Sequence, residues 1–140
     1  MKYLVYASLI LSGASFAQDA PQSAISAINA DKTLLTDITQ TSAGLIAVGK
    51  HGTVIKSIDG SDWQQAKSVP TQVLLTAVEF TNDSNGWACG HDATIINTTD
   101  GGENWQLQQA KPSLDKPCLD IYFKDDLNGY AVGAYGMFYQ

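Results

Sequence analysis

The sequence contains no arginine, since all eight basic residues among its 140 are lysines. A guanidinium group grips a carboxylate or a phosphate at two points, so functions that depend on such a clamp are excluded for this chain. Acidic residues number 14, which makes the formal net charge −6. Nucleic-acid binding needs a basic surface that faces the phosphates, and this charge balance argues against it.

Long hydrophobic runs are equally scarce. The run Tyr3–Leu11 is too short to cross a bilayer. Lys2 precedes it, and the small residues Ser15 and Ala17 stand three and one positions before a cut at Gln18. This is the pattern of a cleaved secretory signal peptide. We therefore expect residues 1–17 to be a signal peptide. The mature chain would be exported without insertion into the membrane, and in a Gram-negative host it would be periplasmic.

Cysteine is also rare, with two residues in the chain. Export would bring Cys89 and Cys118 into an oxidising compartment, where they could form a disulfide. Cys89 lies in the apolar run Gly86–Gly90, which is typical of a buried small side chain and favours two separate buried thiols. There is no C-x-x-C spacing, and two cysteines are too few for a structural zinc site. We expect no metal and no cofactor.

The chain does contain a repeat of about 42 residues. Gly49, Gly90 and Gly133 end three similar apolar runs and lie 41 and 43 residues apart, and Trp63 and Trp105 are separated by 42 residues. Valine, isoleucine, threonine and aromatic residues fill the runs, and glycine, asparagine and aspartate separate them, which is typical of short β-strands. Four short antiparallel strands in such a period form one blade of a β-propeller.

The predicted fold is therefore all-β: a partial β-propeller of about two and a half four-stranded antiparallel blades. The repeat places blade 1 at residues 35–74, blade 2 at 75–117 and an incomplete blade 3 at 118–140. Residues 18–34 are expected to form a closing strand for a neighbouring blade or a mobile linker. Propellers close with about four to eight blades, so we expect a fragment of a longer protein or a subunit that closes by self-association. The strands expected in blade 1 are Leu35–Thr39, Leu45–Gly49, Thr53–Ile58 and Trp63–Lys67.

A second motif follows the third strand of blades 1 and 2. The turn ending at Trp105 fits the Asp-box pattern S/T-x-D-x-G-x-x-W, whereas the turn ending at Trp63 is one residue shorter and has Ser61 in place of glycine. The carboxylate accepts bonds from backbone N–H groups, glycine supplies a positive φ, and the indole packs between strands. We interpret these residues as structural, in preference to a general acid or a calcium ligand. They are Ser57, Asp59, Trp63, Thr98, Asp100, Gly102 and Trp105.

The phrases NGWACG…TTDGGENW and NGYAVG resemble the BNR or Asp-box repeat β-propellers. Within that group they are most similar to the photosystem II assembly and stability factor family and its bacterial relatives, over residues 35–140. The resemblance implies an exported, non-catalytic scaffold for protein–protein interaction or membrane-complex assembly. The photosynthetic members engage their client with an arginine-containing patch, which this chain does not have.

A sialidase-like glycoside hydrolase is the enzymatic alternative, because those propellers also carry Asp-boxes. Their chemistry needs arginines around the substrate carboxylate and a tyrosine nucleophile paired with a glutamate. The chain has no arginine and only two glutamates, Glu79 and Glu103, so it is not expected to be an enzyme. A non-functional remnant of a truncated gene is the third hypothesis.

The turns between the second and third strands hold the candidate binding residues. In a propeller these turns open on one face near the central channel, and the repeat places His51, Asp92 and Tyr135 at equivalent positions. Lys50 and His91 are equivalent to each other. We interpret the five as the rim of a protein-binding surface, with ordinary solvated turns as the alternative. A metal site is not expected, because equivalent turns of successive blades are further apart than metal ligands.

The opposite face collects acidic turn residues, which give it a negative field. No calcium-loop spacing such as D-x-D-x-D-G is present, so these residues are interpreted as solvated turns. They are Asp62, Asp83, Glu103, Asp125 and Asp126.

Overall fold

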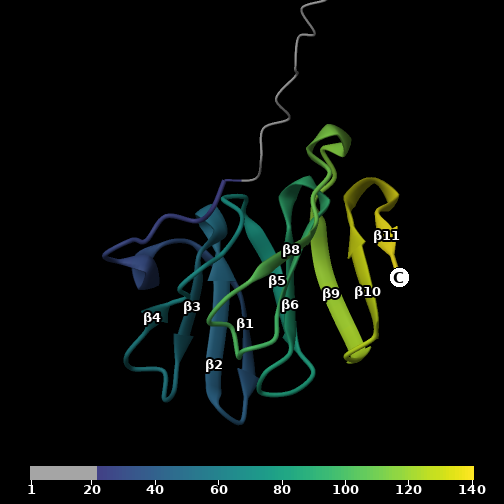
Figure 1. Ribbon diagram of the computed structural model, residues 1–140. Helices are drawn as coiled ribbons and strands as arrows, with labels where there is room; N and C mark the ends of the chain where they lie inside the picture. Colours follow the sequence, from purple (N-terminus) through teal and green to yellow (C-terminus); the bar gives the residue numbers. More distant parts are fainter. Residues whose placement is uncertain (1–21) are drawn as a thin grey trace, which may run out of the picture.

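The computed structural model describes residues 22–140, and the expected signal peptide lies outside this range. The chain folds into three antiparallel sheets set side by side (Figure 1). The innermost strands of neighbouring sheets contact one another, as they do around the axis of a propeller. The predicted all-β, partial β-propeller is thereby confirmed. The strands are β1 (Leu35–Thr41), β2 (Gly44–Gly49), β3 (Val54–Ser57) and β4 (Gln64–Gln65) in blade 1, β5 (Leu75–Phe80), β6 (Gly86–Gly90), β7 (Thr94–Thr98) and β8 (Gln106–Gln109) in blade 2, and β9 (Cys118–Asp125), β10 (Asn128–Gly133) and β11 (Phe138–Tyr139) in blade 3.

Two faces of this arrangement carry the turns. The upper face, at the top of Figure 1, holds the short 3-10 turns η2 (Lys50–Gly52), η3 (His91–Ala93) and η5 (Ala134–Gly136), each of which follows the second strand of a blade. The lower face holds the turns after the first and third strands. All candidate rim residues therefore lie on the upper face, and both Asp-boxes lie on the lower face.

The repeated glycine at the end of each second strand has a steric reason. A Cβ atom on Gly49 would lie 2.0 Å from the carbonyl oxygen of Leu34, and one on Gly90 would lie 2.2 Å from that of Leu74. Both distances are far inside van der Waals contact. The connection into each blade passes so close to the second strand that only glycine fits there.

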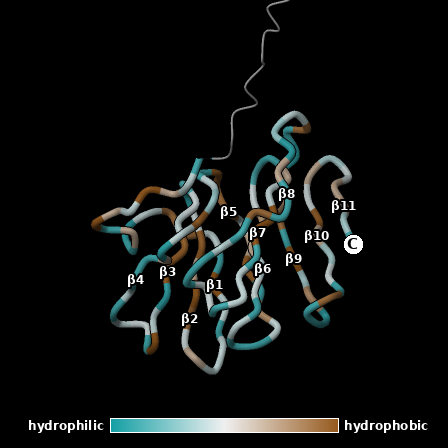
Figure 2. The backbone as a smooth tube through the Cα atoms, viewed as in Figure 1, coloured by the Kyte–Doolittle hydropathy of each residue, from teal (hydrophilic) through white to brown (hydrophobic). Residues whose placement is uncertain are grey.

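Hydrophobic side chains fill the spaces between blades. Ile46, Val54, Val78 and Trp105 belong to one buried cluster formed by blades 1 and 2. A second cluster lies between blades 2 and 3, where the rings of Trp87 and Phe123 stack with centroids 3.8 Å apart. Figure 2 shows hydrophobic stretches within strands such as β2, and hydrophilic residues in several of the turns. These clusters thus lie between neighbouring repeats, because one blade cannot bury its hydrophobic faces without the next blade.

Equivalent threonines join the innermost strands of successive blades. Thr36 donates its hydroxyl to the carbonyl oxygen of Leu75 at 2.6 Å, and Thr76 donates to that of Cys118 at 2.7 Å. In blade 3 the corresponding residue is Leu119, which is 54% exposed. The equivalent threonines of blades 1 and 2 therefore each stabilise the contact with the next blade.

Cys89 of β6 and Cys118 of β9 form a disulfide, with their Cα atoms 5.8 Å apart. The bond joins blade 2 covalently to blade 3. The preferred interpretation as two separate thiols is therefore wrong. Cys89 does lie in a buried apolar strand, as expected, but the packing of β5 against β9 brings the start of the next repeat within bonding distance of it.

The segment before blade 1 lies along the outside of that blade. The Ala24 amide donates to the Val69 carbonyl oxygen at 2.8 Å, and Ala30 is buried against blade 1 beside Ile55. Its only regular element in residues 22–34 is the 3-10 turn η1 (Ala30–Lys32), so the structure places no closing strand in this part of the segment. Within residues 22–140, no helix has the length and apolarity needed to cross a membrane.

Candidate functional site

The three upper turns present equivalent residues in the same unusual conformation. His51, Asp92 and Tyr135 have φ values of 58°, 59° and 55°. A positive φ is uncommon for residues other than glycine, and here it recurs at the middle of each turn. The three turns therefore share the same backbone conformation at their central residue.

The rim side chains are largely open to solvent. Tyr135 is 80% exposed, Lys50, His51 and His91 are exposed, and Asp92 is half-buried. Throughout the described part of the chain, no hydrogen bond or ion pair links these five side chains to one another. The structure thus places them on one face as separate, solvent-accessible groups.

The innermost strands bring together three carboxylates that the sequence analysis did not connect. Glu79 on β5 lies near Asp37 on β1 and Asp120 on β9. Burial raises the pKa of Glu79, and the charges of Asp120 and Asp37 raise it further. Asp37 and Asp120 occupy equivalent positions in the repeat, and that equivalence was the signal that could have revealed the group. No set of three residues suited to a metal ion occurs within residues 22–140.

Replacing Glu79 with glutamine is expected to raise the midpoint of thermal unfolding at pH 7. The folded state raises the pKa of Glu79 above its ordinary value near 4.5, so ionised Glu79 opposes folding, and stability is lost as pH rises through the folded pKa. The gain from Glu79→Gln should therefore shrink as pH falls below 4.5. Thermal unfolding followed by circular dichroism between pH 3.5 and pH 8 measures it.

Glu103→Gln is the matched control, and its effect should have the opposite sign. Hydrogen bonds from Lys56 and Lys67 lower the pKa of Glu103. This carboxylate therefore stabilises the fold above the unfolded pKa and loses that contribution as pH falls through its folded pKa. A shift in the same direction for both variants at pH 7 would contradict the assignment of these two environments.

The second Asp-box has the geometry expected of a structural turn. Asp100 accepts the Asn104 amide at 2.9 Å, the Thr98 hydroxyl oxygen accepts the Gly102 amide at 3.1 Å, and the Trp105 indole donates to the Gly102 carbonyl at 3.1 Å. In this way the turn uses much of the bonding capacity of its own carboxylate. This supports a structural role for the Asp100 carboxylate.

The shorter first box forms a similar turn. Asp59 accepts the Ser61 amide at 2.9 Å, and the Ser57 hydroxyl oxygen accepts the Gly60 amide at 2.8 Å. The Trp63 indole donates to the Gly60 carbonyl oxygen at 3.2 Å. The hydrogen bonds from Ser61 lower the pKa of Asp59. The missing residue thus changes the length of the turn but not its pattern of capping.

Two acidic residues of the lower face connect blades rather than simply facing solvent. Asp83 of blade 2 accepts the Ser42 amide of blade 1 at 2.8 Å and also the Ser42 hydroxyl. Asp126 of blade 3 accepts the Asn85 side-chain amide of blade 2 at 2.7 Å. The interpretation of these aspartates as solvated turns was therefore incomplete, because each one reaches back to the preceding blade.

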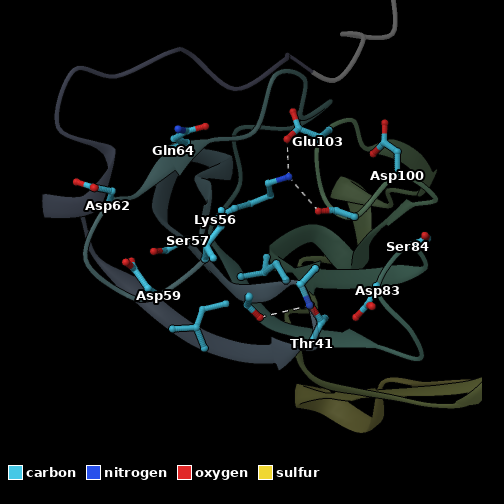
Figure 3. A pocket seen from close by; sticks show the side chains of 16 residues that line it. Thr41, Lys56, Ser57, Asp59, Asp62, Gln64, Asp83, Ser84, Asp100 and Glu103 are labelled. Atoms are coloured by element: carbon cyan, nitrogen blue, oxygen red, sulfur yellow. Dashed lines mark hydrogen bonds and ion pairs between the residues drawn. The ribbon is translucent and has the colours of Figure 1, made fainter.

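A cleft of about 770 Å³ opens on the lower face between blades 1 and 2. Figure 3 shows Lys56 reaching across it from blade 1 to Glu103 of blade 2. The Lys56 ammonium lies 2.5 Å from Glu103 Oε1 and 3.2 Å from the Gly101 carbonyl oxygen. Lys67 lies 3.2 Å from Glu103 Oε2. One carboxylate of blade 2 therefore holds two lysines of blade 1.

The repeats match a known family. Residues 55–116 match the family model described as photosynthesis system II assembly factor YCF48. This part of the chain is therefore similar to the repeat of the photosystem II assembly factor family. The photosystem II assembly protein Ycf48 of Synechococcus sp. (strain JA-3-3Ab) is 45% identical over 49 residues, which are 34% of this chain and 14% of that protein. The photosystem II assembly lipoprotein Ycf48 of Trichormus variabilis is 45% identical over 40 residues, 28% of this chain and 12% of that one.

Solved structures of the family share the fold. The structure of YCF48 bound to a D1 peptide matches with a TM-score of 0.64 at 22% identity, covering 75% of this chain and 36% of that chain. YCF48 from Cyanidioschyzon merolae matches with a TM-score of 0.59 at 17% identity, covering 76% and 37%. This chain therefore spans little more than a third of the solved relatives that it matches.

Proposed function

We propose that this chain is part of an exported, non-catalytic propeller scaffold that binds a protein partner during assembly of a membrane complex. The observation that carries the proposal is the family repeat, since its members are named assembly factors and one solved relative is bound to a peptide. The arginine-free composition and the structural use of the Asp-box carboxylates support a binding role over glycoside hydrolysis.

Export and a periplasmic location form part of the same proposal. The signal-peptide pattern supports them, as does the Trichormus variabilis relative, which is named as a lipoprotein. The disulfide between blades is consistent with a compartment in which thiols are oxidised.

We assign partner binding to the rim residues of the upper face, because three equivalent turns present exposed polar and aromatic groups there. Exposed tyrosine is favoured at protein interfaces, since its ring adds contact area and its hydroxyl can form a hydrogen bond. Together the turns make a row of contact points along successive blades. An extended peptide segment fits such a row.

The test is affinity capture from the cell envelope of the native host, followed by titration of the captured protein. The wild-type chain should recover a specific partner, and the triple variant His51→Ala, His91→Ala, Tyr135→Ala should bind it at least tenfold more weakly. The matched control is Gln106→Ala with Gln108→Ala, on the outer strand β8, which should bind as the wild type does. Equal binding by the rim variant and the control would contradict the assignment of the rim.

A further inference from the structure

We propose that the cleft between blades 1 and 2 is a second binding site, which takes a lysine- or arginine-bearing peptide segment of a partner protein. It lies on the lower face, away from the rim residues, and it does not depend on them. From the sequence, Asp62, Asp83 and Glu103 were expected to lie in solvated turns, and Asp59 and Asp100 to be structural residues of the Asp-boxes. The structure instead gathers several of them around one depression.

The shape of the cleft suits a peptide segment. Its volume of about 770 Å³ lies in the range of sites that enclose several side chains. Apolar parts of Ala43, Leu45 and Ile58 contribute to its lining, so the aliphatic stems of bound side chains would meet apolar surface. Long cationic side chains use such surface for their stems while their charged ends reach polar groups.

The negative charge of the cleft favours a positively charged occupant. Five carboxylates line it against the single ammonium of Lys56, which gives the lining a formal charge of −4. Figure 3 shows Asp59 and Asp62 on one side of Lys56, and Asp83 and Asp100 on the other. Both lysines that form ion pairs in the described part of the chain contact Glu103, so these four aspartates have no cationic partner there.

The environments of Asp59, Asp83 and Asp100 favour the ionised form at neutral pH. Hydrogen bonds from Ser61 lower the pKa of Asp59, and hydrogen bonds from Ser42 lower that of Asp83. Hydrogen bonds from Asn104 and Thr98 lower the pKa of Asp100 despite an opposing effect of burial. The turns that hold the carboxylates in place therefore also maintain their charge.

Lys56 provides an independent indication of the chemistry that the cleft accepts. Its alkyl stem forms part of the lining, and its ammonium is held by a carboxylate and a backbone carbonyl oxygen of the opposite blade. The protein's own side chain thus forms the type of contact that a foreign lysine would form. The remaining aspartates are spread around the opening instead of converging on one point, which suits several cations carried on one chain.

The test uses the full chain and a fluorescein-labelled hexalysine peptide, with hexaglutamate as the control peptide. Fluorescence anisotropy at low ionic strength should show saturable binding of hexalysine that weakens as salt is added. Asp62→Lys reverses one charge at the opening and should weaken binding at least tenfold. Ala43→Trp fills the cleft without changing its charge and should abolish binding.

Asp31→Lys is the matched control, because it makes the same charge change at an exposed residue of η1. It should bind hexalysine within twofold of the wild type. Equal weakening by Asp31→Lys and Asp62→Lys would show attraction to the overall charge of the protein and would overturn the proposal, as would unaltered binding by a folded Ala43→Trp variant. The rim variant should bind hexalysine normally, so failure of one site is distinguishable from failure of the other.

Discussion

Replacing Trp105 with alanine is expected to lower the free energy of unfolding by about 3–5 kcal/mol, the usual cost of deleting a large buried aromatic side chain. Trp105 is 3% exposed and belongs to the cluster between blades 1 and 2. Its ring meets that of Phe80 edge to face, with the centroids 6.1 Å apart. The substitution therefore removes a core side chain and leaves a cavity where two blades meet. Urea denaturation followed by circular dichroism measures the change.

The chain supplies its own control for this experiment at Trp63, the equivalent residue of blade 1. Trp63 forms the same indole hydrogen bond to its turn but is only half-buried. Less apolar surface is removed from water at this position, so Trp63→Ala should cost less than half as much as Trp105→Ala. Similar losses for the two variants would show that the tryptophans stabilise their turns and not the contact between blades.

Removing the disulfide is expected to lower the free energy of unfolding by about 2–4 kcal/mol, the range usual for such bonds. The bond closes a segment with a sequence separation of 29, and both cysteines are fully buried. The double variant Cys89→Ala, Cys118→Ala avoids leaving an unpaired thiol. Urea denaturation with and without reductant should show a loss for the oxidised wild type on reduction.

Reductant should leave the free energy of unfolding of the double variant unchanged. This control distinguishes the loss of the disulfide from any other effect of the reductant on stability. Limited proteolysis should then cleave blade 3 faster than blade 2, because the cross-link is the only covalent contact between β6 and β9 in the described structure other than the main chain. If reductant leaves the midpoint of the wild type unchanged, the two cysteines do not form this bond in solution.

The repeat made most of the fold predictable. The spacing of Gly49, Gly90 and Gly133 showed where each blade begins along the chain. In the structure, backbone oxygens approach Gly49 and Gly90 so closely that no side chain fits at either position. The Asp-box around Asp100 was predictable because its bonds connect residues only a few positions apart. The sequence also showed that His51, Asp92 and Tyr135 are equivalent, and the structure gives all three nearly the same positive φ.

The sequence by itself determined what recurs at a fixed spacing: the strands, the glycines that end them, the hairpin turns and the absence of any guanidinium group. Only the tertiary structure decided what neighbouring repeats do to each other. It joined Cys89 to Cys118, brought Glu79 near two aspartates and turned Asp83 toward Ser42. These contacts join residues about 30 to 40 positions apart, and their distances depend on how one sheet packs on the next, which no local pattern of residues specifies.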